Sequence, residues 1–323
     1  MPEALGNDVI STAVVDFTAD TRTPASAADS SSAPVPRVLI LTAPIGEGHD
    51  VPARFLAAQL SERRPAAHVV VADGLQAMGR TVERVVLGGA PTDSVWRDRV
   101  FDGIHALMTR VPVVPRLCGR LGEALGGRGL LELIARERPD VVVSTYPGVT
   151  EVLGRLRRRG RLTTPTVSAI TDLAALRFWA HPGIDLHLVT HPESAPEVRS
   201  IAGACARIVP VRGLHDPAYA KPRSRDDGRR ALGLALGPRL VVVSGGGWGV
   251  GDLAGAVEES LLVEDTIVVV LCGRNDRLLE GLTVRFAGNA RVRPMGFTTQ
   301  VPDLFAGADA LVHSTAGLTV LEA

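Results

Sequence analysis

The chain has 323 residues, of which 46% are hydrophobic and 4% aromatic, and its 35 basic residues balance 35 acidic ones. This length suits two domains rather than one, since a domain usually holds roughly 100–200 residues. The balanced charge excludes a dedicated nucleic-acid-binding protein, because such proteins carry a clear basic excess.

The cysteines and the N-terminal segment bear on the compartment. Cys118, Cys205 and Cys272 lie far apart and are odd in number, so we expect neither a metal site nor a disulfide framework. No apolar run reaches the roughly 20 residues that a membrane-spanning helix needs. Residues 1–36 show no secretory signal and are rich in Ala, Ser, Thr and Pro toward their end, so we expect a disordered tail and a cytoplasmic protein.

Short apolar runs of the kind found in buried parallel strands begin at Val38–Leu41. A glycine-bearing loop follows, in which Asp50 is expected to cap the next helix, with Pro52 in its first turn. Further strands are predicted at His68–Val71, Val141–Val143, Val167–Ile170, Leu186–Val189 and Ile208–Val211.

A proline-rich and charged segment over residues 217–230 indicates a domain boundary near residue 215. The strands predicted after it are Leu240–Ser244, Ile267–Cys272, Ala290–Arg293 and Ala310–His313. Strands that alternate with helical stretches predict an α/β fold of two doubly wound Rossmann-like domains, residues 37–215 and 216–323.

Glycine-rich loops follow the first strand of each predicted domain, at residues 46–49 and 244–249. Ligands of open α/β sheets bind at the carboxyl ends of the strands, and glycine lets backbone N–H groups approach an anion closely. Neither loop has the third glycine of a dinucleotide fingerprint, and the chain contains no Gly-Lys-Ser/Thr of a P-loop. We therefore expect no nicotinamide or other cofactor.

Seven motifs occur in a fixed order along the chain. They are Gly46-Glu47-Gly48-His49, Thr171-Asp172-Leu173, Phe178-Trp179-Ala180-His181-Pro182, Gly245-Gly246-Gly247, Cys272-Gly273-Arg274-Asn275, Gly296-Phe297-Thr298 and Gly317-Leu318-Thr319-Val320-Leu321-Glu322-Ala323. Over residues 37–323 the set resembles a GT-B glycosyltransferase family. This family contains the monogalactosyldiacylglycerol synthases and the peptidoglycan enzyme that adds N-acetylglucosamine to a lipid-linked intermediate.

The resemblance implies a function and a role for each motif. It implies transfer of a hexose from a UDP-sugar to a lipid, diacylglycerol-like acceptor, with acceptor binding in the first domain and donor binding in the second. The implied catalytic residues are His49 and Asp172, and the implied acceptor-binding residues are Gly46, Gly48, Trp179 and His181. The implied donor-binding residues are Gly245, Gly246, Gly247, Arg274, Asn275, Phe297, Thr298, Ser314, Leu318, Thr319 and Glu322. The resemblance implies an inverting reaction, and because no Asp-x-Asp occurs we expect this reaction to need no metal ion.

Several alternatives stay open at this stage. Asp172 also suits a helix cap, while Trp179 and His181 also suit core or surface positions. Residues 313–317 of this chain are His-Ser-Thr-Ala-Gly, where members of the family usually have a basic residue and a Gly-Gly pair. Family members also continue for several elements beyond the position of Ala323. We therefore expect an incomplete second domain. A UDP-sugar 2-epimerase of the same fold and a non-catalytic remnant that only binds a ligand or partner are the rival functions.

Two arginine-containing stretches, residues 108–133 and 155–161, bear on membrane contact. The first mixes leucine and valine with arginine, which is typical either of a helix packed on its domain or of one that lies on an anionic membrane surface. The second suits a solvated helix end or a site for anionic lipid headgroups. The sequence thus predicts, as one of two readings, a peripheral association with the inner face of the cell membrane.

Overall fold

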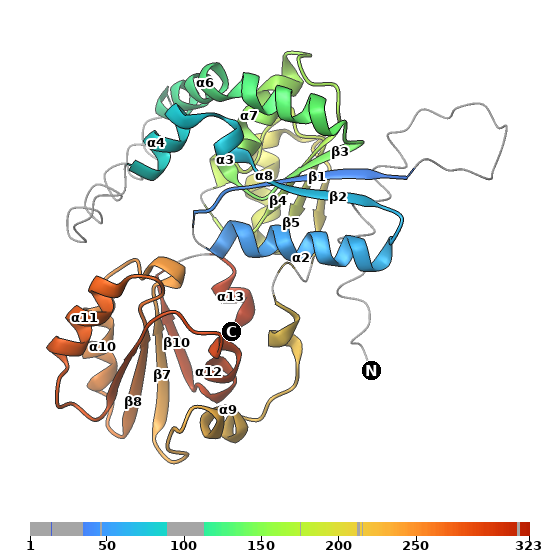
Figure 1. The fold of residues 1–323 in the computed structure, drawn as a ribbon. Helices are drawn as coiled ribbons and strands as arrows, with labels where there is room; N and C mark the ends of the chain where they lie inside the picture. The colour runs from blue at the N-terminus through green and yellow to red at the C-terminus, as the bar shows by residue number, and fades with distance from the viewer. Residues whose placement is uncertain are drawn as a thin grey trace. The chain divides into compact units, whose positions relative to one another are not determined.

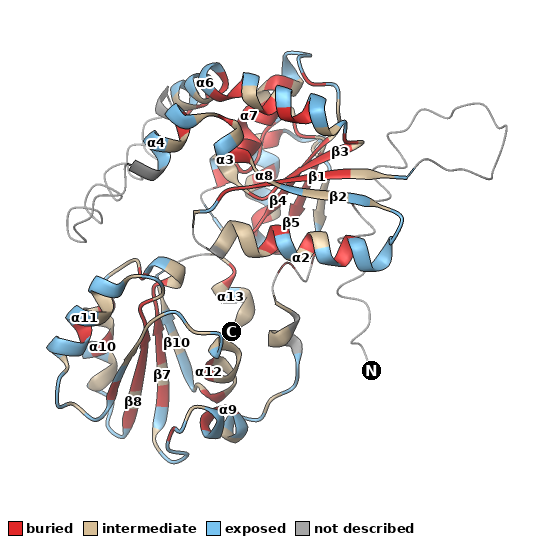
Figure 2. Cartoon of the chain, viewed as in Figure 1, coloured by how far each residue is buried: buried red, intermediate tan, exposed pale blue. Residues whose placement is uncertain are grey.

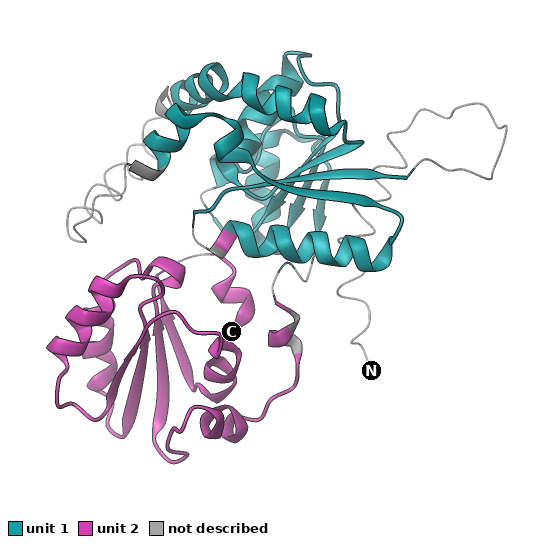
Figure 3. Ribbon diagram, in the orientation of Figure 1, with its two compact units in different colours: residues 1–45, 49–214 teal, residues 46–48, 215–323 magenta. Residues whose placement is uncertain are grey.

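A computed structural model describes residue 14 and residues 35–45, 47–88, 113–174, 176–211, 214, 216–314 and 317–323. The chain divides into two compact units (Figure 3). Unit 1 holds residues 1–45 and 49–214, and unit 2 holds residues 46–48 and 215–323. The predicted tail lies outside the described residues, apart from Val14, Val35 and Pro36.

Unit 1 is built on a six-stranded parallel sheet with the order β2-β1-β3-β4-β5-β6 (Figure 1). Its strands are β1 (Arg37–Thr42), β2 (His68–Asp73), β3 (Val141–Ser144), β4 (Thr166–Ile170), β5 (Leu186–Val189) and β6 (Ile208–Pro210). Each strand predicted in this half is present.

Helices cover both faces of this sheet. They are α2 (Glu47–Arg63), α3 (Gly74–Ala77), α4 (Arg80–Gly88), α6 (Val113–Glu137), α7 (Pro147–Arg158) and α8 (Ala195–Ala202), with 3₁₀ turns η1 (Leu176–Phe178) and η2 (Pro192–Ser194). Alternate residues of β1 enter different cores, because successive side chains of a strand point to opposite faces. Val38 and Ile40 pack in the cluster that contains α2, whereas Leu39 and Leu41 pack in the cluster of α3, α6 and α7. In the part of the chain that the structure describes, no helix is both long and apolar enough to cross a bilayer.

The start of α2 differs from the prediction. The helix begins at Glu47, so Asp50 lies within it and pairs with Arg54 at 3.4 Å instead of capping its N-terminus. Pro52 is likewise inside the helix and has no N–H to donate. The Thr42 hydroxyl, at the end of β1, donates to the His49 carbonyl at 3.0 Å and holds this early first turn against the sheet.

Unit 2 has a four-stranded parallel sheet with the order β10-β7-β8-β9. Its strands are β7 (Arg239–Ser244), β8 (Thr266–Leu271), β9 (Val292–Met295) and β10 (Ala310–His313). Its helices are α9 (Arg225–Ala231), α10 (Leu253–Leu261), α11 (Asp276–Arg285), α12 (Val301–Gly307) and α13 (Thr319–Glu322), with 3₁₀ turns η3 (Pro217–Ala220) and η4 (Gly246–Trp248). The predicted strand Ala290–Arg293 begins two residues later, because the Asn289 side chain and carbonyl accept from the N–H groups of Arg291 and Val292 in a turn.

The second sheet also separates two cores, and Figure 2 shows its central strands buried. Val243 and Val268 face α10 and α11, while Val242 and Val269 face the cluster that contains Leu304 of α12. The aliphatic runs predicted from the sequence therefore fill both faces of both sheets, as expected for parallel sheets.

A buried arginine ties the edge of unit 2 together. Arg229 of α9 is fully buried and its guanidinium donates to the Asp309 carboxylate at 2.6 Å and to the Gly307 carbonyl at 2.8 Å. Asp309 also accepts from the N–H of Leu240 at 2.7 Å, at the start of β7. One carboxylate thus joins α9, β7 and the segment before β10.

Removal of this carboxylate should destabilise unit 2. We predict that Asp309→Ala lowers the free energy of opening of β7 by about 3–5 kcal/mol, because it leaves the Arg229 charge buried and uncompensated. Hydrogen exchange of the buried β7 amides measures this loss. The matched control is Glu258→Ala, which breaks a pair with Arg285 whose side chains are 51% and 52% exposed and should cost less than about 1 kcal/mol. Equal losses in the two variants would show that the buried pair has no special weight.

Candidate functional site

The strand order of each unit creates one position where ligands are expected. In unit 1 the chain runs from β1 to β2 and returns to β3 on the other side of β1; in unit 2 it runs from β7 through β8 and β9 and returns to β10 beside β7. At such reversals the connections leave in opposite directions, so the carboxyl ends of the two neighbouring strands stay open to a ligand. His49 follows β1, and the glycines at 245–247 follow β7.

His49 lies among aromatic side chains at the β1/β3 reversal. Its ring centroid is 5.2 Å from that of Tyr146, which follows β3, in an edge-on arrangement, and 5.6 Å from that of Trp179. A ring nitrogen of His49 donates to the Thr145 carbonyl, whereas Nδ1 is buried with no hydrogen-bond partner among the described residues. One nitrogen of the imidazole therefore has no partner among the described residues, and it is shielded from solvent.

Asp172, which follows β4, is linked to the same cluster through Trp179. The indole Nε1 donates to Asp172 Oδ2 at 2.7 Å, so the carboxylate holds the tryptophan rather than capping a helix. Trp179 is only 1% exposed and packs with Leu176 and Ile170, which agrees with the core alternative left open for it. Its ring nonetheless lies beside the imidazole of His49.

Burial and charge act on the His49 pKa in opposite directions. Burial disfavours the imidazolium and lowers the pKa of His49 below its usual 6.5, while the Asp172 charge and the Thr145 carbonyl partly offset that decrease. At neutral pH the imidazole is therefore uncharged and able to accept a proton.

His181 lies away from this group of contacts. Its Nδ1 accepts from the N–H of Gly183 at 2.9 Å, and its ring packs so closely on α7 that a Cβ at Gly154 would meet it at 2.3 Å. Burial lowers the pKa of His181 to about 4. The structure thus gives His181 a packing environment, which is the alternative to acceptor binding. Gly46 lies outside the described residues, and at Gly48 an added Cβ would meet no described atom within 4 Å.

The glycine loop of unit 2 packs on the loop that follows β8. A Cβ at Gly245 would meet the backbone of Val250 at 2.5 Å, so only glycine allows this close turn. The N–H of Arg274 donates to the Gly247 carbonyl at 2.8 Å, and Asn275 caps α11 by accepting from the N–H of Leu278 at 3.1 Å. The donor-binding residues expected in these two loops therefore form one continuous backbone surface.

The end of β10 completes this surface. The Ser314 hydroxyl donates to the Val250 carbonyl, and its Cβ lies where a side chain at Gly251 would collide. After the glycine loop the chain enters η4, and α10 begins only at Leu253, capped by the Asp252 carboxylate. The N–H of Gly246 already donates to Ser244 at 3.2 Å. Within the loop, this N–H is accordingly less available to an anion.

Arg274 and Phe297 form a flat face beside these loops. The guanidinium carbon lies 3.8 Å from the ring centroid, and Phe297 is 50% exposed. Stacked guanidinium and aromatic planes attract each other electrostatically and present a surface on which another planar ring can lie. Thr298 is next to this face, and its hydroxyl accepts from the N–H of Gln300 at 3.1 Å.

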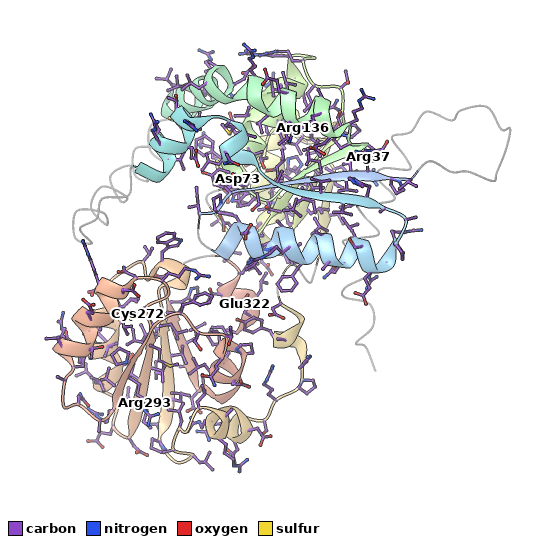
Figure 4. The ribbon with its side chains drawn as sticks, in the orientation of Figure 1. Arg37, Asp73, Arg136, Cys272, Arg293 and Glu322 are labelled. Atoms are coloured by element: carbon purple, nitrogen blue, oxygen red, sulfur yellow. The ribbon has the colours of Figure 1, made fainter. Side chains whose placement is uncertain are left out.

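Glu322 lies on α13 with Leu318 and Thr319 at the start of that helix (Figure 4). The Tyr219 hydroxyl of η3 donates a hydrogen bond to its carboxylate. Burial and the charge of Asp216 raise the pKa of Glu322 to about 7, and the Tyr219 hydrogen bond partly offsets the increase.

Three side chains at these positions were missed by sequence reasoning. Tyr146 and Tyr219 contact His49 and Glu322, and His191, after β5, is buried with its Nε2 unpartnered among the described residues. Burial lowers the pKa of His191, and the charges of Glu193 and Asp172 partly offset that decrease. The only signal available was that Tyr146 and His191 follow predicted strand ends; the Tyr219 contact carries no local signal. Among the described residues, no three His, Cys, Asp or Glu side chains gather where they could share a metal ion.

Comparisons with known sequences identify relatives of this chain. Residues 121–214 match the family described as monogalactosyldiacylglycerol (MGDG) synthase. A processive diacylglycerol beta-glucosyltransferase of Bacillus subtilis (strain 168) is 24% identical over 297 residues, which cover 89% of this chain and 74% of that protein. A protein of the same description from Bacillus licheniformis is 25% identical over 207 residues, covering 62% of this chain and 52% of that protein.

Solved structures confirm the fold class. Acinetobacter baumannii MurG has a TM-score of 0.51 at 16% identity, over 90% of this chain and 75% of that chain. Sucrose-phosphate synthase from Thermosynechococcus elongatus has a TM-score of 0.54 at 12% identity, over 89% of this chain and 78% of that chain. The two parallel Rossmann-like sheets give the chain a GT-B fold, and its sequence is similar to the monogalactosyldiacylglycerol synthase family and to diacylglycerol beta-glucosyltransferases.

Proposed function

We propose that this chain carries the residues of a glycosyltransferase that moves a hexose from a UDP-sugar to the hydroxyl group of a diacylglycerol-like lipid, with inversion at the anomeric carbon. One observation carries the proposal: the alignment with the Bacillus subtilis diacylglycerol beta-glucosyltransferase runs over 89% of the chain and so includes most of both units. The positions of His49 and of the glycine loop at the two strand reversals support it.

In unit 1, His49 is the proposed general base. Its uncharged imidazole accepts the proton of the acceptor hydroxyl while that oxygen attacks the anomeric carbon. The carbon–oxygen bond to the nucleoside diphosphate breaks on the opposite side, and the electron pair leaves with the phosphate. Asp172 stabilises the imidazolium that forms, since its charge already raises the pKa of His49.

In unit 2, the two loops around the glycines are the proposed donor site. Backbone N–H groups of Gly245 and Gly247 are proposed to donate to the diphosphate, whose growing charge needs donors fixed in advance. The face of Arg274 and Phe297, with Thr298 beside it, contacts the base. Leu318 and Thr319 begin the helix that presents Glu322 to the ribose hydroxyls, and Asn275 and Ser314 hold the loops together.

The decisive experiment is an assay of UDP release. The protein is incubated with UDP-glucose or UDP-galactose, with and without diacylglycerol in detergent micelles, in the presence of EDTA. We expect UDP release only with the acceptor, together with a glycolipid product. Release of UDP without any acceptor would indicate the 2-epimerase, and UDP binding without turnover would indicate a ligand-binding protein. Loss of activity in EDTA that Mg²⁺ restores would overturn the metal-independent chemistry.

The assigned base makes a specific prediction about turnover. His49→Ala should reduce kcat by roughly 10²–10⁴-fold, the usual contribution of a general base, while the Kd for UDP stays within about twofold. The proposed donor residues all belong to unit 2 and His49 belongs to unit 1, so the substitution leaves every proposed donor residue in place. Isothermal titration with UDP and initial-rate kinetics separate the two quantities, and His68→Ala, an exposed histidine of the same unit, is the control. A parallel decrease in donor affinity would assign His49 a different role.

The pH profile tests the role of Asp172. His49 acts as a base only when neutral, so kcat/KM should fall as the pH decreases through its lowered pKa, below 6.5. Because the Asp172 charge raises that pKa, Asp172→Asn should move the acid limb to lower pH while the maximal rate decreases. The amide oxygen can still accept from Trp179, which keeps the packing. The control is Glu132→Gln, on the exposed face of α6, which should leave the acid limb of the pH profile unchanged. A shift of the acid limb to higher pH in Asp172→Asn would contradict the role assigned to Asp172.

Membrane contact of unit 1 is proposed at α6. The helix packs its glycines inward, so closely that a Cβ at Gly129 would meet the Ala77 carbonyl oxygen at 1.9 Å. Three leucines in its N-terminal half face outward: Leu117, Leu121 and Leu125, one turn apart, are 63%, 56% and 47% exposed, whereas Leu130 and Leu133 further along are buried. Only the N-terminal half of α6 therefore departs from the usual pattern of a packed helix, in which the apolar stripe faces the core.

Arginines flank this leucine stripe. Arg116, Arg120 and Arg128 are exposed on the same helix, as expected for a helix that lies on an anionic lipid surface. The other basic stretch, residues 155–161, is largely neutralised, since Arg155 pairs with Glu151 at 2.6 Å and Arg159 pairs with Glu123 at 2.8 Å. Residues 108–112 of the predicted membrane-facing stretch lie outside the described residues.

Vesicle binding tests the α6 surface. Leu121→Asp should reduce binding to phosphatidylglycerol-containing vesicles by roughly tenfold or more, because a buried leucine contributes about 1.5–3 kcal/mol. Sedimentation with the vesicles measures the bound fraction. Val284→Asp, which changes a 76% exposed valine of unit 2, is the matched control and should have little effect. Equal loss in both variants, or binding that neither changes, would place the membrane contact elsewhere.

A further inference from the structure

Asp216, Tyr219 and Glu322 lie close together in unit 2. Tyr219 lies on η3, which Asp216 caps by accepting from the N–H of Ala218 at 2.7 Å. The Tyr219 hydroxyl donates to the carboxylate of Glu322, on α13, which is far away in the sequence. This contact has no part in the chemistry proposed above.

The position of Tyr219 is fixed independently of Glu322. Its ring centroid lies 6.0 Å from that of Phe305 on α12, and the two rings are tilted by 37°. Arg223, just after η3, pairs with Asp303 of α12 at 3.0 Å and also donates to the Ala218 carbonyl. Because the Tyr219 ring contacts Phe305 and Arg223 links the Ala218 carbonyl to Asp303 of α12, the position of the hydroxyl does not depend on the carboxylate.

We propose that Tyr219 is a positioning residue for the donor: its hydroxyl orients the Glu322 carboxylate so that both ribose hydroxyls of a uridine diphosphate can donate to it. This inference rests on the proposed role of Glu322 in donor binding. A carboxylate has two oxygens with about four acceptor positions, so one tyrosine hydroxyl leaves enough capacity for two ribose hydroxyls.

The hydrogen bond from Tyr219 also affects the protonation state of Glu322. Burial and Asp216 raise the pKa of Glu322 to about 7, whereas the Tyr219 hydrogen bond lowers it. The titratable groups that act on this carboxyl among the described residues are Asp216 and Tyr219, both from η3 and its cap, while Asp303 of α12 is paired with Arg223. A charged carboxylate accepts hydrogen bonds more strongly than a protonated one. Ribose binding should therefore weaken as the pH decreases through neutrality, and loss of Tyr219 should move that transition upward.

The test measures binding of UDP by isothermal titration across neutral pH. Tyr219→Phe keeps the ring on Phe305 and removes only the hydroxyl, so the fold should be retained, which thermal unfolding checks. We expect roughly three- to tenfold weaker UDP binding at neutral pH and a midpoint of the pH dependence shifted upward. Binding of 2′-deoxy-UDP should change less, since it lacks one of the ribose donors. Thr283→Val, which removes an exposed hydroxyl from α11, is the control and should match the unmodified protein.

The outcomes separate this inference from the proposed function. If UDP binds and Glu322→Gln weakens it, but Tyr219→Phe changes neither affinity nor midpoint, the positioning role of Tyr219 is wrong and the donor site stands. If Glu322→Gln leaves UDP binding unchanged, the ribose role of Glu322 is wrong and the inference fails with it. If the unmodified protein does not bind UDP at all, the proposed function itself is overturned.

Discussion

The pairing of β3 with β1 is the constraint on which the first site depends. Val38 pairs with Val141 and Leu41 with Ser144, so the chain must return across β1 after β2. This return leaves the carboxyl ends of both strands uncovered. His49 follows the end of β1 and Tyr146 follows the end of β3, and their ring centroids lie 5.2 Å apart. If β2 lay between β1 and β3, as in a sheet with sequential strand order, the two rings would not be in contact. The register of one strand pair thus sets the surroundings of the candidate base.

The same constraint operates in unit 2 with different side chains. His313 of β10 pairs with Ser244 of β7, and this register brings Ser314 against the turn at Val250 and Gly251. Here the site is made mainly of backbone, because glycines allow the loops after β7 and β8 to touch. A surface of fixed backbone N–H groups suits an anion, whereas the aromatic and imidazole side chains of unit 1 suit proton transfer.

Much of the fold could be predicted from the sequence, because strands that are buried on both faces have continuous apolar sequences. The strands and the fold class were predicted for that reason, and the two loops were predicted from their glycines. The early start of α2 was not, since it depends on the Thr42 hydrogen bond to the His49 carbonyl rather than on local capping. The burial of His181 and the contact between Tyr219 and Glu322 involve residues distant in sequence, and no periodicity or spacing encodes them.

Burial favours the uncharged form of both His49 and Glu322, but this helps the proposed role of His49 and hinders that of Glu322. It lowers the pKa of His49 and raises the pKa of Glu322, because in both cases the charged form loses hydration. The neutral form of His49 is the one that can accept a proton, so burial favours the proposed chemistry. The neutral form of Glu322 is the weaker hydrogen-bond acceptor, so burial opposes the proposed donor binding. A hydrogen bond from Tyr219 offsets that effect in the required direction, which gives a physical reason for a tyrosine at a position that contributes to neither sheet.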